Sequence, residues 1–298
     1  MQRILVIKLG ALGDFVLAFG PFASIRAAHP RAHITLLTTP PFVGLAGAAP
    51  WFDAVAVDHR PRWWNLPALV RLRRTLRGYD FVFDLQTSRR TSRYYRMAGR
   101  PPWSGIAPGA SHPHANPARD AMHTLDRQRE QLQAAGVPPA PVDLGWLGGK
   151  GPDVPAPFAV LVPGAAPHRP AKRWPAENFA ALARRLDNAG IRPVVAGSRA
   201  EAPLAHAILS ACPAALDLTG RTSLPDLAAL LARAHVAVGN DTGPMHLAAA
   251  VGAPCVVLFS NASDPALTAP RGRPDQVTVL HAPRLADLSV ARVAAALP

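Results

Sequence analysis

The chain has 298 residues, of which 49% are hydrophobic, so it can fill the cores of two ordinary domains or of one large domain. It contains no run of about 18 apolar residues and no cleavable signal pattern at its amino terminus, which argues against a membrane-spanning helix and favours a cytoplasmic protein. Its formal net charge is +13, and its two cysteines, Cys212 and Cys255, lie in apolar surroundings that indicate neither a disulfide framework nor a metal site.

The positive charge is concentrated in the first half of the chain. Residues 1–150 hold 19 Lys and Arg against 9 Asp and Glu, a net charge of +10, whereas residues 151–298 hold 13 against 10, a net charge of +3. This asymmetry indicates an anionic partner, for which nucleic acid, a phosphorylated glycolipid and the anionic face of a membrane are candidates. The alternative is that the arginine content reflects coding bias alone.

Residues 3–9 form a short apolar run without a clear period, which is typical of a strand buried on both faces of a parallel sheet. A turn that contains Gly10, Ala11, Gly13 and Asp14 follows, and then an apolar helix is predicted over 15–28. The turn has G-x-x-G spacing and not the G-x-G-x-x-G of dinucleotide-binding folds, so NAD binding is disfavoured. Asp14 stands at the helix start, where a carboxylate can serve chemistry or simply cap the helix.

Further strands are predicted over 33–37, 54–57 and 79–85, with an arginine-rich helix between the last two. Four arginines follow the carboxyl ends of these strands, namely Arg60, Arg62, Arg89 and Arg90. Because parallel strands end at the same edge of a sheet, these arginines are expected to face one crevice. A solvated basic surface is the alternative.

Residues 100–117 are rich in Pro, Gly, His and Ser and are predicted to be a loop. A helix follows in which His123 and Arg127, spaced i and i+4, share one face, either beside the crevice or as a surface pair. Residues 138–157 lack periodicity and are expected to be the interdomain linker. The predicted domains are therefore 1–150, which includes the linker from about 138, and 151–298.

The second half repeats the alternation of strand and helix. Strands are predicted over 158–162, 193–196, 215–218, 255–259 and 277–280, with another short strand from position 236. Two nucleotide-type α/β domains in tandem are expected, with the ligand in the cleft between them. For the last predicted helix, 286–297, packing back on the first domain is one option.

The segment 236–259, VAVGNDTGPMHLAAAVGAPCVVLF, contains a candidate phosphate cradle. It is predicted to run from a strand through a glycine-containing loop into a helix that starts near Pro244. A helix that opens directly after such a loop leaves backbone N–H groups unpaired and directs the positive end of its dipole at the loop. An anion is favoured there.

The absence of several motifs disfavours some classes of reaction. The sequence has no D-x-D pair and no cluster with metal-ligand spacing, so the charge of a diphosphate would fall to the helix start at Asp241, Thr242 and Gly243 and to cations such as Lys172. It also lacks a phosphate-loop motif and a G-x-S-x-G elbow, which disfavours nucleotide hydrolysis and serine esterase chemistry. Transfer of a group from an activated nucleotide to an anionic acceptor fits what remains.

Six segments carry a family resemblance: IKLGALGDFVLAFGPFASIRAAHP, YDFVFDLQ, HTLDRQREQL, KRWPAENF, LTGRTSLPDLAALLARA and GNDTGPMHLAAAVGAP. Through them the chain resembles the heptosyltransferases of glycosyltransferase family 9, which add heptose from an ADP-sugar to the lipopolysaccharide core. The resemblance implies an α/β fold of the GT-B type, with two facing Rossmann-like domains, parallel sheets and an interdomain cleft. It also implies a nucleotide sugar as donor, an anionic glycolipid or saccharide as acceptor, and neither a metal nor a cofactor.

The resemblance also implies a role for each matching residue. Asp14 would be the general base that takes a proton from the acceptor hydroxyl, so that attack inverts the anomeric carbon, and Lys172 would bind the diphosphate and stabilise the departing nucleotide. The other donor-binding residues would be Gly10, Ala11, Glu201 at the ribose, Thr222 and Ser223 at the adenine, Asp241, Thr242, Gly243 and His246. The acceptor-binding residues would be Arg60, Arg62, Arg90, His123 and Arg127. Without the family, the polar donor residues would be interpreted as helix caps or turn formers.

Departures from the family pattern leave alternatives open. Related members often carry serine or threonine where this chain has Gly10 and Ala11, and Ser260 stands where a glycine is expected. The donor sugar could therefore be a hexose or another heptose, and the acceptor an O-antigen, a capsule or a small-molecule glycoside. A non-catalytic nucleotide-sugar-binding protein is a second class.

The membrane and nucleic acid are the remaining partner questions. A glycolipid acceptor predicts peripheral contact with the cytoplasmic face of the inner membrane. Nucleic acid is not expected as a partner, because stacking would need many aromatic residues among the basic ones and the chain is 6% aromatic.

Overall fold

The computed structural model describes residues 1–149, 151–273 and 275–298, which form two compact units. Unit 1 comprises Met1–Trp146 and unit 2 comprises Leu147–Pro298. The boundary falls inside the segment 138–157 that the sequence predicts as the linker. Lys150, the last residue of the predicted first domain, lies outside the described residues.

Unit 1 contains a six-stranded sheet in which every pair of neighbouring strands is parallel. In sheet order the strands are β3 (Ala54–Val57), β2 (His33–Thr38), β1 (Arg3–Ile7), β4 (Phe81–Asp84), β5 (Trp103–Gly105) and β6 (His112–Pro113). In the central strand β1, the side chains from Ile4 to Ile7 are fully buried. Both faces of β1 are covered, which explains why its apolar run shows no alternation.

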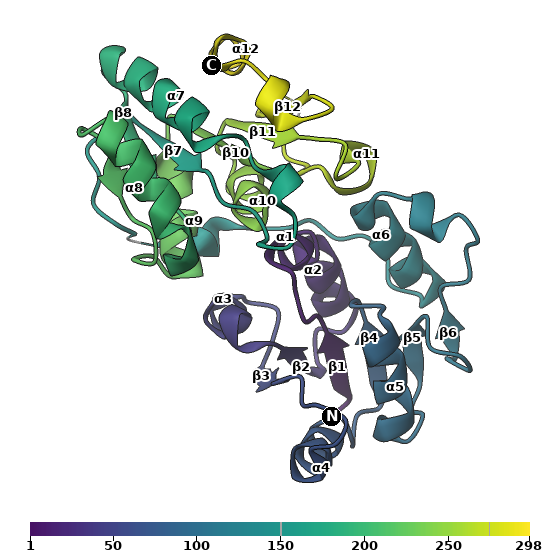
Figure 1. Cartoon of the computed structure of the whole chain (residues 1–298). Helices are drawn as coiled ribbons and strands as arrows, with labels where there is room; N and C mark the ends of the chain where they lie inside the picture. Colours follow the sequence, from purple (N-terminus) through teal and green to yellow (C-terminus); the bar gives the residue numbers. More distant parts are fainter. Residues whose placement is uncertain (150, 274) are drawn as a thin grey trace. The chain divides into compact units, whose positions relative to one another are not determined.

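Helices cover both faces of this sheet (Figure 1). They are α1 (Leu12–Val16), α2 (Phe19–Ala28), α3 (Val43–Ala48), α4 (Leu66–Thr75), α5 (Arg89–Ala98) and α6 (Thr124–Ala134), with short 3-10 turns η1 (Pro40–Phe42), η2 (Arg119–Ala121) and η3 (Gly145–Leu147). On one face, Leu72 of α4 and Tyr94 of α5 share a core with Leu5 of β1. On the other, Phe83 of β4 faces the ring of His29 at the end of α2, with ring centroids 5.9 Å apart.

Two predictions for unit 1 need correction. The single helix predicted over 15–28 is two helices, because the chain turns at Leu17 and Ala18 and the Phe15 ring then packs against Phe22 with centroids 5.5 Å apart. The loop predicted over 100–117 contains β5 and β6, since Trp103 is fully buried and pairs with Val82 of β4. Tertiary pairing here overrides a Pro- and Gly-rich local sequence.

Unit 2 repeats the strand order of unit 1. Its parallel sheet runs β12 (Val277–His281), β11 (Cys255–Phe259), β10 (Val236–Asn240), β7 (Phe158–Val162), β8 (Arg192–Val195) and β9 (Leu216–Asp217). The first strand of each unit lies beside its fourth, and the second and third extend away from it, which is the order of nucleotide-binding Rossmann folds. Strands β7, β10 and β11 are buried along their whole length.

The helices of unit 2 are α7 (Ala176–Asn188), α8 (Ala202–Ala211), α9 (Leu224–Arg233), α10 (Gly243–Ala250), α11 (Pro265–Thr268) and α12 (Val290–Ala294), with 3-10 turns η4 (Pro170–Lys172), η5 (Arg199–Glu201) and η6 (Leu285–Asp287). The helix predicted over 286–297 is shorter than expected and divides into η6 and α12. Val293 of α12 is fully buried in a core that also holds Leu182 of α7. The helix is therefore held by unit 2, and its packing on the first domain stays a prediction.

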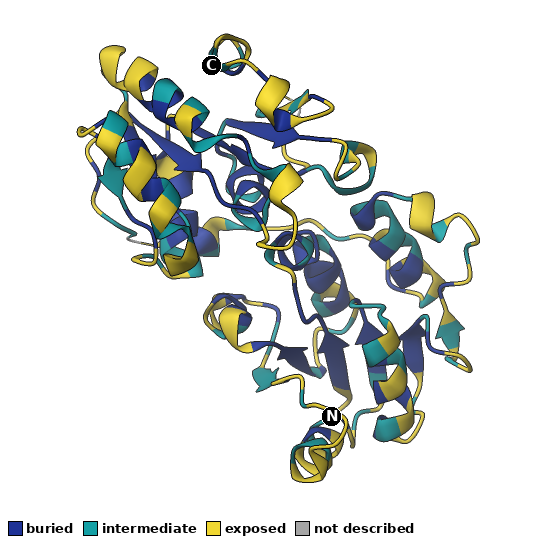
Figure 2. Cartoon of the chain, in the orientation of Figure 1, coloured by how far each residue is buried: buried dark blue, intermediate teal, exposed yellow. Residues whose placement is uncertain are grey.

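Burial follows the sheets, whose strands are mostly dark blue in Figure 2, while the outward faces of the helices are exposed. Trp174 is among the largest fully buried side chains, and its Nε1 donates to the carbonyl of Leu288 at 2.8 Å. This contact anchors the loop after β7 to the core. Among the described residues, no helix combines the length and the apolar composition needed to cross a bilayer.

Gly239 provides a test of the packing around the centre of unit 2. A Cβ at this position would lie 2.7 Å from both Met245 Sδ and Val162 Cβ, so we expect Gly239→Ala to lower the free energy of unfolding by about 1–3 kcal/mol. Gly44→Ala in α3 is the control, since nothing lies within 4 Å of its added Cβ and alanine favours a helix. Urea unfolding measures both, and equal stability of the two variants would contradict this account.

Candidate active site

The candidate residues gather where the strand order of each sheet reverses. This point lies between β1 and β4 in unit 1 and between β7 and β10 in unit 2. In open parallel sheets, ligands bind outside the carboxyl ends of the strands at such a switch point. The loops after these four strands and the helices that follow them contain nine of the sixteen residues that the sequence predicts for the site.

Asn240, at the end of β10, connects the loops of the unit 2 switch point. Its side chain is fully buried, and its Nδ2 donates to the carbonyl of Pro163 at 2.8 Å. Its Oδ1 accepts from the backbone N–H of Trp174 at 2.9 Å. Both ends of the loop after β7 are thereby fastened to β10, so that Lys172 within this loop is held close to the start of α10.

Lys172 and Asp241 form a nearly buried ion pair. Their side chains are 13% and 6% exposed, and Lys172 Nζ donates to Asp241 Oδ2. The same oxygen accepts from Ser263 Oγ at 2.7 Å. A buried charge needs such a partner, so the pair gives Asp241 a structural reason to lie beside a predicted phosphate site. Ser263 lies in the segment after β11, and sequence reasoning did not select it.

The start of α10 has the geometry of an anion site. Thr242 is the N-cap residue with extended backbone, but its side chain makes no capping hydrogen bond and instead donates to the carbonyl of Asn240 at 3.2 Å. The helix begins at Gly243 and ends at Ala250, close to the prediction. Backbone N–H groups of its first turn are therefore left for a ligand, and His246 is buried one turn further along.

The predicted adenosine-side residues have local partners as well. Glu201 accepts from the backbone N–H of Ser198 in a capping box and lies against Gly164, where an added Cβ would collide with its carboxylate. Ser223 caps α9, and its hydroxyl donates to Asp226 Oδ2 at 2.6 Å. This hydroxyl therefore has the helix-capping role that the residue type alone suggests. Thr222 precedes it and is half-buried.

At the unit 1 switch point, the structure adds two buried charges that sequence reasoning did not select, Lys8 and Asp84. Lys8 Nζ donates to the carbonyl of Leu85 at 3.1 Å. Burial lowers the pKa of Lys8 to about 8, against the opposing effect of the Asp14 carboxylate. Burial likewise raises the pKa of Asp84 to about 6, although the amide of Thr87 opposes the shift. The signal in the sequence was a lysine inside an otherwise apolar strand run.

Asp14 lies in the first turn of α1 and is half-buried. Gly10 and Ala11 precede it in the loop after β1, and an added Cβ on Gly10 would lie 2.5 Å from the ring of Phe42. The loop therefore packs against the Phe42 ring at Gly10, where a larger side chain would collide with that ring.

Two further cations surround Lys8. Arg119 and Arg127 both lower its pKa through space, whereas Asp14 and Asp84 raise it, so these charges lie near Lys8. Arg119 Nη2 donates to Thr87 Oγ1 at 2.7 Å, which places it against the loop after β4. Arg119 was missed because it follows a Pro- and Gly-rich stretch without periodicity. His123 caps α6, where its Nδ1 accepts from the N–H of Leu125 at 3.2 Å.

The sequence predicts that Arg60, Arg62, Arg89 and Arg90 face one crevice, and this stays a prediction. The structure shows local contacts for three of these arginines. Arg60 Nη2 donates to the carbonyl of Leu9 at 2.8 Å, beside the first loop. Arg90 Nη1 donates to the carbonyl of Pro61 at 3.4 Å. Pro61 stands between Arg60 and Arg62 in the sequence. Their guanidinium groups also pack on tryptophans, Arg62 on Trp64 and Arg90 on Trp63.

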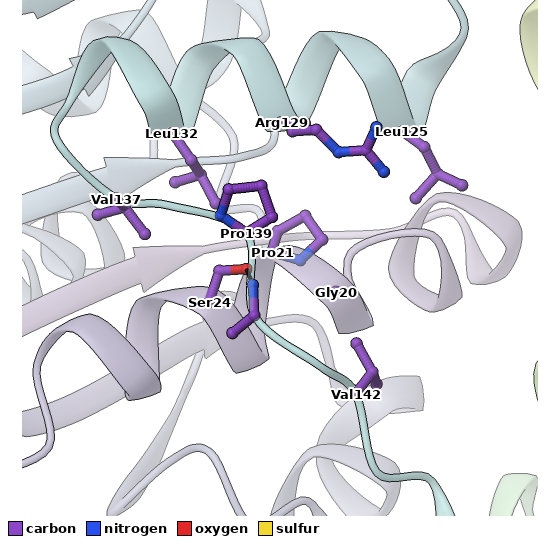
Figure 3. A pocket seen from close by; sticks show the side chains of 10 residues that line it. Gly20, Pro21, Ser24, Leu125, Arg129, Leu132, Val137, Pro139 and Val142 are labelled. Carbon is purple, nitrogen blue, oxygen red and sulfur yellow. Dashed lines mark hydrogen bonds between the residues drawn. The ribbon is translucent and has the colours of Figure 1, made fainter.

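A separate cavity of about 140 Å³ lies in unit 1 between α2, α6 and the chain after α6 (Figure 3). Its lining is largely apolar, with Arg129 at its rim, and Ser24 Oγ accepts from the N–H of Ala140 at 3.0 Å. It contains none of the predicted site residues. In the described part of the chain, no group of three or more His, Cys, Asp and Glu side chains could hold a metal ion.

Sequence comparison agrees with this geometry. The pattern of glycosyltransferase family 9 (heptosyltransferase) matches residues 111–295, which is more than half of the chain. The chain belongs to glycosyltransferase family 9. The matched part includes Lys172, the start of α10 and the α6 helix, whereas Asp14 and the arginines of the 60–90 region precede it.

Individual relatives match parts or most of the chain. Lipooligosaccharide heptosyltransferase 2 of Haemophilus influenzae is 36% identical over 130 residues, which is 42% of this chain and 36% of the relative. The aligned part thus spans about a third of that protein. Lipopolysaccharide heptosyltransferase 1 of Pseudomonas aeruginosa is 28% identical over 302 residues, covering 91% of this chain and 82% of the relative.

Solved structures of the family share the fold. The Escherichia coli heptosyltransferase WaaC with ADP superposes with a TM-score of 0.82 at 23% identity, covering 99% of this chain and 98% of that one. Together with the two parallel sheets, this confirms the predicted GT-B type α/β fold.

The buried carboxyl of Asp84 predicts an unusual pH dependence. Because its pKa is about 6 in the folded chain against 3.8 ordinarily, the unfolded chain releases this proton first as pH rises, and the free energy of unfolding falls. Between pH 5 and 7 the loss from this group is roughly 1 kcal/mol. The stability of the unmodified chain relative to Asp84→Asn, measured by urea unfolding, should therefore decrease over this interval.

Asp53 is the control for that measurement. The amide of Ile34 and the Arg26 guanidinium lower its pKa, so the stability that it contributes is present above its ordinary pKa and is lost as pH falls. The stability of the unmodified chain relative to Asp53→Asn should not decrease from pH 5 to 7. If its stability relative to Asp84→Asn also failed to decrease, the assignment would be contradicted.

Proposed function

We propose that the chain is an inverting, metal-independent glycosyltransferase that moves heptose from ADP-heptose to an anionic glycolipid such as the lipopolysaccharide inner core. The observation that carries the proposal is the Lys172–Asp241 pair at the open start of α10, in a chain that belongs to this family. Solved relatives named for ADP and for ADP-2-deoxy-2-fluoro heptose support the choice of donor.

Unit 2 would bind the donor. The first turn of α10 offers backbone N–H groups and a positive dipole end to the diphosphate, and Lys172 adds a full charge. Lys172 has three N–H donors, of which Asp241 uses one, so it can hold a phosphate oxygen without leaving the carboxylate. These groups would do the work of a metal ion, and the nucleotide sugar is a substrate rather than a cofactor. Gly243, Thr242 and His246 would position the sugar and diphosphate, with Glu201, Thr222 and Ser223 at the adenosine.

Unit 1 would supply the base. In this proposal Asp14 takes the proton of the acceptor hydroxyl while the oxygen attacks the anomeric carbon opposite the departing ADP, which inverts the configuration. Lys8 lies nearby and is charged below a pH of about 8, so it adds a positive charge beside the Asp14 carboxylate. Gly10 and Ala11 would leave room for the donor phosphates.

The arginines would recognise the acceptor. Arg60, Arg62 and Arg90 form one group, and Arg127 with Arg119 forms another beside Lys8. Planar guanidinium forks pair well with phosphates and carboxylates, which the lipopolysaccharide inner core carries in abundance. His123 caps the helix that carries Arg127 and would act by positioning it. We propose that the enzyme works in the cytoplasm, at the inner face of the inner membrane, without a nucleic-acid partner.

Asp14→Asn tests the base. The amide keeps the shape but cannot take a proton, so transfer should fall by about 10²- to 10⁴-fold while the thermal shift produced by ADP is unchanged. Assays with ADP-heptose and an inner-core acceptor are run in EDTA, which the unmodified enzyme should tolerate. Asp80→Asn is the control and should keep full turnover, because Asp80 directly precedes β4, at the amino-terminal ends of the strands. Near-normal transfer by Asp14→Asn would remove this residue from the mechanism.

Lys172→Met tests the donor site. Loss of a charge-assisted hydrogen bond should weaken ADP binding by about tenfold or more in calorimetry. The variant also leaves the Asp241 carboxylate buried without its lysine, which would lower stability by itself. The double variant Lys172→Met with Asp241→Asn removes this charge, so its stability should recover while ADP binding stays weak. Arg169→Met, an exposed cation of the same loop, should bind ADP normally; unchanged affinity in the two Lys172 variants would refute the assignment.

A further inference from the structure

Helix α4 and the residues before it expose an unusual combination of side chains. Seven large hydrophobic residues of the described chain are exposed, and four of them lie here: Trp63, Trp64, Leu66 and Val70. Trp64 is 74% exposed and Leu66 is 67% exposed. Exposed apolar residues that cluster on a soluble surface mark an interaction site.

The same segment is strongly basic. Between positions 60 and 78 the sequence has six arginines and no acidic residue. Within the described part of the chain, no carboxylate forms an ion pair with Arg62, Arg73 or Arg74. These charges are therefore available to an anionic partner.

The apolar and basic residues share one face of α4. Leu66, Val70 and Arg73 are spaced four and three apart, so they lie in one row along the helix, with Arg74 beside them. Leu72 and Leu76 point the other way and join the core of unit 1. Leu66, Val70, Arg73 and Arg74 are all exposed, and much of α4 has the colour of exposed residues in Figure 2. We define the α4 surface as Arg62, Trp63, Trp64, Leu66, Val70, Arg73 and Arg74.

We propose that the α4 surface is the contact of this protein with a bilayer that contains anionic phospholipids. Aliphatic and tryptophan side chains enter the headgroup region, where arginines pair with lipid phosphates, and a basic helix with such a row is typical of proteins that lie on a membrane surface. The inference rests on the proposed function for its purpose, since a glycolipid acceptor must be met at a membrane. It adds which residues make the contact.

Nucleic acid is the competing partner, and the geometry disfavours it. Base stacking needs open aromatic faces, but the Trp63 ring lies under the guanidinium groups of Arg90 and Arg93, with centroid distances of 5.0 and 4.9 Å. Leu66 and Val70 offer nothing to a phosphate backbone, whereas lipid tails favour them. A bilayer uses every member of the α4 surface.

The surface also adjoins the proposed acceptor arginines. Arg62 belongs to both, and its guanidinium lies 5.3 Å from the Trp64 ring centroid. Arg90 packs on Trp63 and lies beside the carbonyl of Pro61. A glycolipid in the bilayer would thus present its phosphates to Arg60, Arg62 and Arg90 once the α4 surface has docked.

Vesicle flotation tests the proposal with the full chain. The unmodified protein should bind vesicles of phosphatidylcholine with phosphatidylglycerol and not vesicles of phosphatidylcholine alone. Arg73→Gln with Arg74→Gln should weaken binding by about 25-fold at low salt, because each arginine near an anionic surface contributes about fivefold. Leu66→Ser with Val70→Ser should weaken it by about tenfold.

Matched controls lie on unit 2. Arg184→Gln with Arg185→Gln removes an adjacent pair of exposed arginines from α7, and Val279→Ser removes an exposed apolar residue from β12. Both should bind vesicles like the unmodified chain. Equal loss in the controls, or full binding by both α4 variants, would overturn the proposal. The surface would be assigned to nucleic acid instead if the unmodified chain bound single-stranded RNA tightly and only the Arg73 and Arg74 double variant lost RNA binding, while its vesicle binding persisted.

Activity separates this proposal from the proposed function. Both α4 double variants should keep full transfer to a soluble, delipidated inner-core acceptor and lose transfer to the same acceptor embedded in vesicles. Loss on the soluble acceptor as well would overturn the surface assignment. If the unmodified chain transfers sugar to neither acceptor, the proposed function fails, and vesicle binding still decides the role of the α4 surface.

Discussion

The buried side chain of Asn240 is the contact on which the candidate donor site depends. It satisfies the carbonyl of Pro163 and the N–H of Trp174, which begin and end the loop after β7. Buried backbone groups left without partners are costly, so this amide holds both ends of the loop in place. Lys172 lies inside that loop and consequently meets Asp241. The Lys172–Asp241 pair and the uncapped first turn of α10 together form the candidate anion site of unit 2.

Unit 1 has the same strand order, but the buried charges at its switch point have partners of a different kind. Unit 2 pairs a cation directly with a carboxylate, whereas in unit 1 the buried Lys8 donates to a backbone carbonyl and the buried Asp84 accepts from backbone amides. Burial without an opposite charge in direct contact shifts the pKa of each group, down for Lys8 and up for Asp84. This contrast agrees with a division of labour in which one unit holds the donor and the other carries the base.

The uneven charge of the chain also acquires a physical meaning. The excess of arginine in the first half separates into a half-buried group around Lys8, a group on the loops after β3 and β4, and the exposed α4 surface. The three groups therefore differ in exposure, from half-buried around Lys8 to exposed on α4.

The sequence by itself determined the alternation of strands and helices, a helix start near Pro244 and the family, because burial periodicity, capping residues and motif spacing are local signals. It also predicted that Arg60, Arg62, Arg89 and Arg90 lie at one edge of the sheet, since parallel strands end at the same edge. Only the tertiary structure decided that Lys172 pairs with Asp241, that Ser263 joins them, and that Lys8, Asp84 and Arg119 complete the other site. It likewise decided the turn between α1 and α2 and the strand β5. The physical reason is that each of these features is a contact between residues far apart in the chain, or a turn made by packing, which the local sequence does not specify.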